Sequence, residues 1–202
     1  MQERQVRWNE RFSRGEETHA YRPSPPLPEA IEGAPPGLAL DIACGAGRHS
    51  IYLAERGFRV VAVDWAQRGL DALMAEAERR GLADRIEPVL ADLEAGDFRI
   101  EPGRYDVVCD FYFLSRALFP AMRDGVREGG LFVAAIHEES ASAEAPHRFL
   151  LAPGELGRIV SGWGFELVHS SEGPSQEGGH QHATAHIAAR RYASPAGLTT
   201  RS

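Results

Sequence analysis

Leu38-Ala-Leu-Asp-Ile-Ala-Cys-Gly-Ala-Gly-Arg48 is the stretch that decides the fold of this 202-residue sequence. Its apolar start predicts a buried strand, and Gly45 and Gly47 allow a tight turn in which the backbone approaches a ligand closely. A helix predicted over residues 48–56 points its N-terminus at that turn. The next predicted strand ends at Asp64, which is placed to hydrogen-bond a ribose. Strand, turn, helix, strand and acid in this order predict a nucleoside-cofactor site.

Two classes of cofactor, dinucleotides and S-adenosylmethionine, use this arrangement, and the charge of Asp41 decides between them. A dinucleotide would place its pyrophosphate beside this carboxylate, and the repulsion at 4 Å is roughly 1 to 4 kcal/mol. S-adenosylmethionine instead carries an ammonium and a sulfonium, which a neighbouring acid stabilises. The dinucleotide fingerprint also favours Gly or Ala at position 50, where this chain has Ser50. The cofactor is therefore predicted to be S-adenosyl-L-methionine, with S-adenosyl-L-homocysteine as its product.

The glycine turn resembles the first motif of the class I S-adenosylmethionine-dependent methyltransferases, apolar-Asp-x-x-Cys-Gly-x-Gly. The segment Ala91-Asp92-Leu93 resembles the part of that family whose Asp reads the adenine amino group. Tyr105-Asp-Val-Val-Cys-Asp110 resembles the fourth strand, which ends beside the transferred methyl group. Residues 127–135 resemble the fifth strand with its preceding turn. This resemblance implies the fold, the activity and the cofactor of the family.

Three further segments are similar to the tellurite-resistance and thiopurine methyltransferase-like branch of this family. They are Trp8-Asn-Glu-Arg-Phe12, the residues 110–120, and Arg148-Phe-Leu-Leu-Ala-Pro-Gly-Glu-Leu156. The resemblance extends from about Trp8 to Arg191. It implies a small-molecule acceptor such as a thiol or a metalloid oxyanion.

Alternation of strand and helix patterns predicts an α/β fold, a Rossmann-like doubly wound seven-stranded mostly parallel sheet with a C-terminal antiparallel hairpin. The expected strands are 38–42, 59–64, 86–90, 106–110, 131–137, 165–170 and 183–190. The expected helices are 5–13, 48–56, 66–80, 116–127 and 153–161, and the proline-rich residues 22–37 are expected to be a loop. Three segments follow: an N-terminal helix and proline-rich lid or crossing segment (1–37), a cofactor-binding methyltransferase domain (38–192) and a C-terminal tail (193–202).

Ligands of open α/β sheets bind outside the carboxyl ends of the strands, which gathers the candidate cofactor residues at one rim. The methionine part is expected at the glycine turn and the adenine between Trp65 and Leu93. Trp8 and Tyr21 are expected to cover the cofactor, although packing of the N-terminal helix explains them equally well. Trp65 has the same alternative as a half-buried residue at a helix start. The predicted cofactor-binding residues are Asp41, Ala43, Gly45, Gly47, Asp64, Trp65, Asp92, Leu93, Asp110 and Tyr21.

The acceptor side is expected after the fourth and fifth strands, where His137, Tyr112 and Arg148 are the predicted catalytic residues. Phe111 and Phe113 flank Tyr112, and aromatic faces stabilise a sulfonium. Arg148 and Arg116 would face an anionic acceptor, or else form surface salt bridges. His137 would be a general base for a hydroxyl or ammonium acceptor, or else a rim histidine without a proton-transfer role. The branch implies a non-basic residue there, so His137 departs from its pattern.

Composition excludes several other functions. The net charge of −7 predicts no nucleic-acid partner, and the absence of a long apolar run predicts no membrane segment and a cytoplasmic location.

Cys44 and Cys109 are expected to pack as small hydrophobes, and no metal site is predicted. His180, His182 and His186 share a strand face but span roughly 20 Å, too far for one ion. The alternatives are an NAD-dependent oxidoreductase, for which no Tyr-x-x-x-Lys pattern is present, and a non-catalytic S-adenosylmethionine-binding module. The oligomeric state stays open.

Overall fold

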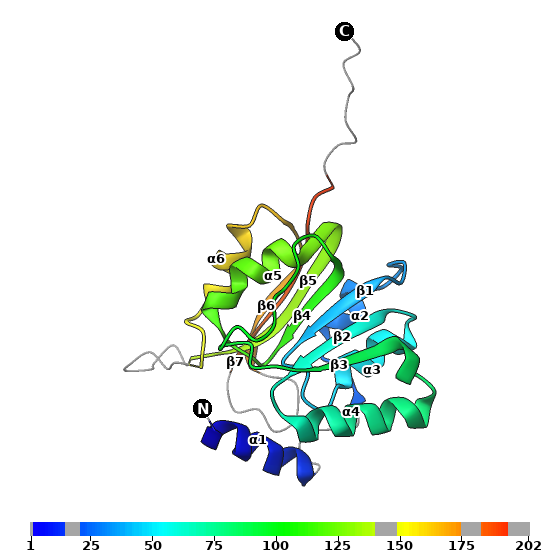
Figure 1. The fold of residues 1–202 in the computed structure, drawn as a ribbon. Helices are drawn as coiled ribbons and strands as arrows, with labels where there is room; N and C mark the ends of the chain where they lie inside the picture. Colours follow the sequence, from blue (N-terminus) through cyan, green and yellow to red (C-terminus); the bar gives the residue numbers. More distant parts are fainter. Residues whose placement is uncertain (1, 15–20, 140–148, 175–182, 194–202) are drawn as a thin grey trace.

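A computed structural model of the chain describes residues 2–14, 21–139, 149–174 and 183–193. They contain a seven-stranded sheet with the order β3-β2-β1-β4-β5-β7-β6, which Figure 1 shows as a twisted central layer. The strands from β3 to β5 are parallel, whereas β7 runs antiparallel to both of its neighbours, β5 and β6. The predicted fold class is therefore confirmed. The strands are β1 (Leu38–Ile42), β2 (Arg59–Asp64), β3 (Ile86–Leu90), β4 (Tyr105–Phe111), β5 (Val126–Glu138), β6 (Glu166–Pro174) and β7 (Ala183–Arg190).

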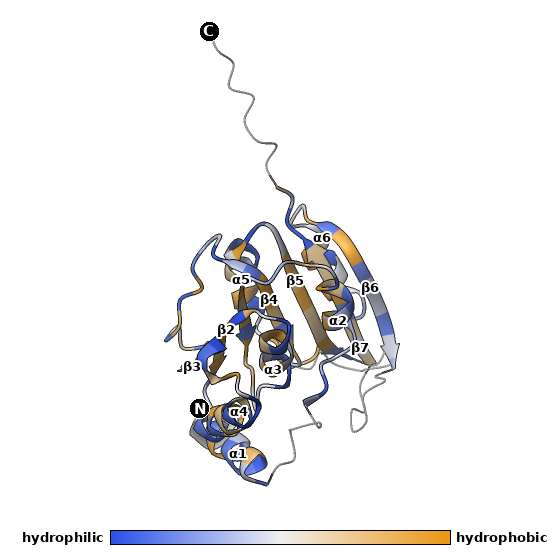
Figure 2. Ribbon diagram, turned by 90° about the vertical axis from the view of Figure 1, so that its right-hand side faces the viewer, coloured by the Kyte–Doolittle hydropathy of each residue, from blue (hydrophilic) through white to orange (hydrophobic). Residues whose placement is uncertain are grey.

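Helices cover both faces of this sheet. On one face, α2 (Pro26–Ala30), α3 (Arg48–Glu55) and α4 (Gln67–Arg80) bury their apolar side chains in one core cluster. On the other, α5 (Phe119–Gly125) and α6 (Glu155–Ser161) form the second cluster. Figure 2 shows the hydrophobic residues concentrated on the central strands between these layers. In a sequence, parallel strands that are buried on both faces appear as continuous apolar runs. Their positions could therefore be predicted well.

Two predicted segments differ from the structure. The proline-rich residues 22–37 were expected to be a loop, but they contain α2, which packs against β5 and β7. Pro26 suits the first turn of a helix, and the burial of Leu27 and Ala30 stabilises a helix too short to form alone. The helix expected over 116–127 is split into a 3₁₀ turn and α5, and β5 begins already at Val126.

The N-terminal helix α1 (Gln2–Ser13) lies beside α4, as Figure 1 shows. The Asn9 side-chain oxygen accepts a 2.9 Å hydrogen bond from the Arg68 amide in the first turn of α4. Ala66, at the N-cap position of α4, supplies no side-chain hydrogen bond, so Asn9 performs that capping role from another helix. Gln5 donates a 2.7 Å hydrogen bond to the Trp65 carbonyl. These contacts hold α1 over the start of α4.

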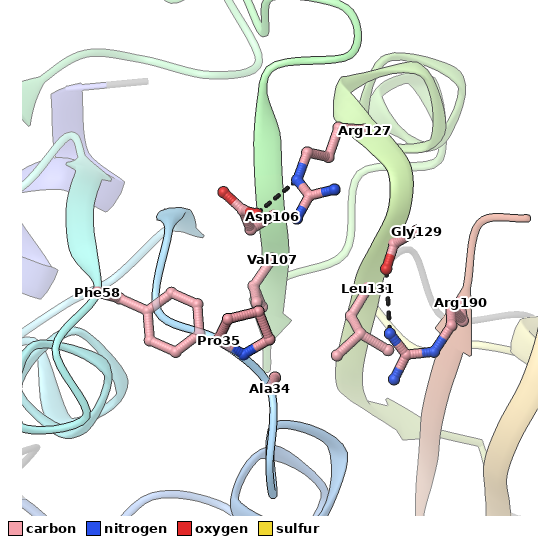
Figure 3. A pocket seen from close by; sticks show the side chains of 9 residues that line it. All are labelled: Ala34, Pro35, Phe58, Asp106, Val107, Arg127, Gly129, Leu131 and Arg190. Atoms are coloured by element: carbon pink, nitrogen blue, oxygen red, sulfur yellow. Dashed lines mark hydrogen bonds and ion pairs between the residues drawn. The ribbon is translucent and has the colours of Figure 1, made fainter. Parts of the chain in front are cut away.

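A polar cluster ties the strands together at the end of the sheet opposite to the carboxyl ends of β1 and β4 (Figure 3). The Asp106 carboxylate accepts a 2.7 Å hydrogen bond from the Leu38 amide and pairs with the Arg127 guanidinium. Arg190 donates to the Gly129 carbonyl at 3.0 Å. The cavity between these side chains measures about 30 Å³, which is too small for a cofactor. This end of the sheet is structural.

Replacement of Asp106 by Ala is expected to lower the free energy of unfolding by about 1 to 3 kcal/mol, because the Leu38 amide loses its acceptor and Arg127 its partner. Urea unfolding measures this loss. The control Glu101→Ala removes an exposed pair with Arg104 and is expected to cost less than about 0.5 kcal/mol. Equal losses in the two variants would show that Asp106 has no special role.

Candidate functional site

A cavity of about 670 Å³ opens at the carboxyl ends of the central strands, and α1 forms part of its wall. Its size lies within the range of small-molecule and cofactor sites. It is also where parallel α/β sheets bind ligands, beside β1 and β4, at which the strand order reverses. The predicted site residues that line it are Ala43, Gly45, Gly47, Asp64, Trp65, Asp92, Leu93, Tyr112 and His137.

The glycine turn after β1 has the backbone geometry that its sequence demands. Gly45 and Gly47 have φ values of 58° and 81°, in the left-handed region. A Cβ at Gly47 would lie 2.2 Å from the Leu73 side chain, so this position accepts no larger residue without rearrangement of α4. Ala43 also has a positive φ, 52°, which is strained for a residue other than glycine. The turn thus packs closely against α4 while its residues 43–47 line the cavity.

Asp64 is fixed at the end of β2 by two backbone amides. One carboxylate oxygen accepts a hydrogen bond from Gly45 and the other from Ala66, each at 2.8 Å. Burial raises the pKa of Asp64 above its ordinary value, and these amide hydrogen bonds partly offset the rise. Each oxygen keeps a second acceptor site, and the side chain lines the cavity. This geometry suits a pair of ribose hydroxyls.

Asp92 and Leu93 follow β3 on the same side of the cavity. One Asp92 oxygen accepts hydrogen bonds from the amides of Glu94 and Ala95, at 2.9 and 3.1 Å, which fixes the carboxylate in a local turn. Leu93 is buried, and Trp65 is half-buried at the cavity wall. A hydrogen-bond acceptor beside apolar and aromatic side chains suits an adenine ring, because its amino group donates a hydrogen bond and its faces are apolar.

Asp41 and Asp110, two predicted cofactor residues, lie behind the cavity and do not line it. Asp41 is buried, and one of its oxygens accepts a 2.6 Å hydrogen bond from the Ser50 hydroxyl, which joins β1 to α3. Burial raises the pKa of Asp41 to about 7. Asp110 is also buried, and neither of its oxygens accepts a well-formed hydrogen bond within the described part of the chain. Burial raises the pKa of Asp110 well above its usual range. The alternation of side chains along β1 and β4 directs both acids into the core.

Tyr21 also lies outside the cavity, although it was expected to cover the cofactor. Its hydroxyl is 3.5 Å from the Ala72 carbonyl, and its ring packs on the core beside the Arg80 guanidinium. Trp8, by contrast, lines the cavity from α1 and stacks on Phe12 with 5.7 Å between the ring centroids. Of the two aromatic residues expected to cover the cofactor, Trp8 therefore lines the cavity and Tyr21 does not.

The part of the cavity beside β4 and β5 is built around Tyr112 and His137. Tyr112 follows β4 with a φ of 63°, and its amide donates a 2.7 Å hydrogen bond to the Ala135 carbonyl on β5. Its ring centroid is 4.7 Å from that of His137. His137 Nδ1 lies 3.2 Å from the Thr184 hydroxyl, which orients the imidazole. Strained backbone at such a position is typical of functional sites.

The two predicted arginines of the acceptor side have different outcomes. Arg116 forms an ion pair with Glu155, at 2.5 Å, outside the cavity, as its alternative interpretation predicted. Arg148 lies outside the described residues, together with His180 and His182. His186 lies on β7, and within the described ranges no three potential metal ligands gather.

Arg48 and His49 line the cavity but were not predicted as site residues. Arg48 is the first residue of α3, where a cation opposes the helix dipole. That mismatch is the signal in the sequence that points to a function at position 48. His49 stacks on Phe111 with 3.7 Å between the ring centroids, which places it beside the end of β4.

Comparison with known proteins agrees with this site. Residues 39–130 match the family described as "Methyltransferase domain". The chain is 30% identical over 139 residues to the probable S-adenosyl-L-methionine-dependent methyltransferase TehB of Haemophilus influenzae, covering 64% of this chain and 47% of that protein. The crystal structure of that TehB aligns with a TM-score of 0.67 at 22% identity, over 82% of this chain and 61% of the other.

A second solved structure is the Burkholderia thailandensis 1,6-didemethyltoxoflavin-N1-methyltransferase with its bound 1,6-didemethyltoxoflavin and S-adenosylhomocysteine. It aligns with a TM-score of 0.69 at 20% identity, over 93% of this chain and 87% of that one, which shows the shared fold.

The chain is thus similar to S-adenosylmethionine-dependent methyltransferases in fold and, over residues 39–130, in sequence, and these matches support S-adenosylmethionine as its cofactor. The chain is similar to TehB in both sequence and structure. It spans about half the length of the curated TehB proteins that it matches. None of the described helices has the length and apolar character needed to cross a bilayer.

The buried Asp41 predicts a pH dependence of stability. Its pKa is about 7 in the folded chain, against about 4 for an exposed Asp. Between these values the folded state holds the extra proton, so the free energy of unfolding falls as the pH rises towards 7 and levels off above it. Between pH 5 and pH 8 the wild type is expected to lose roughly 1 to 3 kcal/mol more than Asp41→Asn. Urea unfolding at both values measures this difference.

The control for this experiment is Asp71→Asn on the exposed surface of α4, which is expected to keep the wild-type pH slope. An identical slope in Asp41→Asn would mean that this acid is already ionised in the folded protein at pH 5.

Proposed function

We propose that this chain transfers the methyl group of S-adenosylmethionine to a small-molecule acceptor by in-line displacement. The observation that carries the proposal is one cavity with two chemically different halves. Asp64 and Asp92 line one half, beside the glycine turn, and Tyr112 and His137 line the other. The first half suits an adenosyl group and the second suits the nucleophile that meets it.

The residues of the first half fit the cofactor part by part. Asp64 would accept hydrogen bonds from both ribose hydroxyls, because two amides already fix its orientation. Asp92 would accept from the adenine amino group, while Trp65 and Leu93 would hold the ring between them. The backbone of Ala43, Gly45 and Gly47 would contact the methionine part. Asp41, Asp110 and Tyr21 would act indirectly, because none of them lines the cavity.

The cofactor supplies a methyl group on a sulfonium, and its leaving group is a neutral thioether. The chain would therefore contribute positioning and exclusion of water. Tyr112 would present its ring face to the sulfonium. His137, oriented by Thr184, would accept the proton of a hydroxyl or ammonium acceptor. The segment 1–37 would serve as the lid of domain 38–192, because α1 already forms a wall of the cavity.

A cavity of about 670 Å³ has room for the adenosyl group and a small acceptor. We propose a thiol, a metalloid oxyanion or another small nucleophile. The Burkholderia relative supports a small acceptor, because its structure holds 1,6-didemethyltoxoflavin. A thiolate or an oxyanion has no proton for His137 to remove, whereas a ring nitrogen or a hydroxyl acceptor would need His137 as a base.

Calorimetric titration with S-adenosylmethionine, S-adenosylhomocysteine and NAD tests the proposed cofactor site. Micromolar binding of the two adenosyl compounds is expected, with none of NAD. Asp64→Asn exchanges one carboxylate oxygen for a donor, so S-adenosylhomocysteine should bind at least about tenfold more weakly, a loss of about 1.4 kcal/mol. Asp71→Asn on α4 is the matched control and should bind as the wild type does.

Binding of NAD alone would replace the proposal with an oxidoreductase. Tight binding of both adenosyl compounds without turnover of any thiol, metalloid oxyanion or heteroaromatic alcohol would favour a non-catalytic binding module.

The role of His137 has a separate test with the first acceptor found by such a screen. For an acceptor that loses a proton, His137→Gln is expected to lower turnover by about 10²-fold or more and to remove the acid limb of the pH profile. S-adenosylhomocysteine affinity should stay unchanged. The control His169→Gln alters an exposed histidine on β6. An unchanged rate at every pH would exclude His137 as a base.

A further inference from the structure

The acids that line the cavity gather in one half, whereas cations line it at several places, which include Arg7 and Arg11 of α1. The acids Asp64, Asp92 and Glu94 follow β2 and β3, at the adenosine half. Arg48, at the start of α3, and His137, on β5, line the other half. Among the described residues that line the part beside β4 and β5, none is acidic. The acceptor half therefore favours a negatively charged group.

We infer that Arg48 binds an anionic oxygen group of the methyl acceptor, a carboxylate or an oxoanion, with Ser24 and His49 as its positioning residues. This inference rests on the proposed methyl transfer, since it names the chemical class of the acceptor for the same site.

The position of Arg48 is fixed on both sides of its guanidinium. The group donates hydrogen bonds to the Ser24 hydroxyl at 3.1 Å and to the Arg22 carbonyl at 3.4 Å. Its Cζ atom lies 5.4 Å from the centroid of the Tyr112 ring. Arg48 thus reaches from the glycine turn towards the residue that would face the reacting methyl group. A planar guanidinium held in this way is suited to recognition of carboxylates and oxoanions.

Burial strengthens this preference. Arg48 is only 8% exposed, so its charge acts in a medium of lower dielectric than water. It also begins α3, whose N-terminus adds partial positive charge at the same place. Burial and the helix N-terminus both disfavour the Arg48 cation in isolation, and both stabilise an anion that enters the cavity. A neutral acceptor would gain neither.

Ser24 and His49 form the support of Arg48. The Ser24 amide donates a 3.2 Å hydrogen bond to His49 Nε2, and the Ser24 hydroxyl lies 3.1 Å from the same nitrogen. His49 is in turn stacked on Phe111. This support joins the segment before α2 to α3 and to the end of β4, and it holds the guanidinium on the acceptor side.

The competing occupant is the carboxylate of the cofactor's own methionine. The direction of the side chain argues against it. Asp64 and Asp92 fix the adenosine half over β2 and β3, whereas Arg48 extends to Tyr112 and Ser24 on the β4 side. The two possibilities differ in one measurable respect, since only a cofactor contact makes S-adenosylhomocysteine affinity depend on Arg48.

The experiment is calorimetry of the full chain, with and without saturating S-adenosylhomocysteine, against benzoate, inorganic sulfate and neutral benzamide. We expect benzoate, sulfate or both to bind and benzamide not to bind, and the stronger anion tells a carboxylate site from an oxoanion site. Arg48→Gln should weaken anion binding at least tenfold and leave S-adenosylhomocysteine affinity within twofold. The control Arg56→Gln removes another arginine that stacks on a tyrosine, at the far end of α3, and should change neither.

Three results would overturn the inference: no anion binds, anions bind equally to Arg48→Gln, or that variant loses affinity for S-adenosylhomocysteine but not for methylthioadenosine, which lacks the carboxylate. Arg48→Lys keeps the positive charge but loses the paired donors of the guanidinium, so it replaces Arg48→Gln if that variant fails to fold. It should weaken benzoate binding at least threefold, and unchanged binding would also overturn the inference. Failure of the wild type to bind S-adenosylhomocysteine would overturn the proposed function instead, while the titration without it still decides the role of Arg48.

Discussion

The hydrogen bonds that Asp64 accepts from the amides of Gly45 and Ala66 are the constraint on which the rest of the site depends. They join the turn after β1 to the start of α4, so that the β1–α3 and β2–α4 connections both donate a hydrogen bond to the same carboxylate. The same group lines the cavity, which means that the residue best placed for the ribose also holds the glycine turn in its left-handed geometry. Structure and binding are therefore coupled at this position, and loss of the carboxylate affects both.

The acids of the central strands divide into two kinds for a reason that lies in strand geometry. Asp64 is the last residue of β2, at the rim, whereas Asp41 lies one residue before the end of β1. In register Asp41 lies beside Ala62, two residues before Asp64, so it is farther from the carboxyl ends of the strands, and burial raises its pKa to about 7. Repulsion of a pyrophosphate by Asp41 is weaker than the sequence suggested, since the carboxyl binds Ser50 instead. The preference for S-adenosylmethionine is carried by the family match and by the geometry of the turn.

The sequence predicted the sheet well because each central strand is a continuous apolar run bounded by turn residues. It predicted the lining role of Asp64, Asp92 and His137 because residues after parallel strands share one edge. It could not place Tyr21, whose position depends on how the segment before α2 crosses α4. Nor could it identify α2, since a helix of five residues exists only through its tertiary contacts. Arg48 was missed because a residue after a glycine turn is first interpreted as the start of a helix.

The helix α1 gives the cavity a wall that is weakly attached to the rest of the fold. Its described attachments to the start of α4 include the Asn9 cap of Arg68 and the Gln5 contact with the Trp65 carbonyl. Hydrogen bonds of this kind contribute about 1 kcal/mol each, far less than the burial that holds the sheet. The Trp65 side chain lines the cavity while its backbone carbonyl accepts the Gln5 hydrogen bond, so α1 meets the cavity wall at the residue that precedes α4.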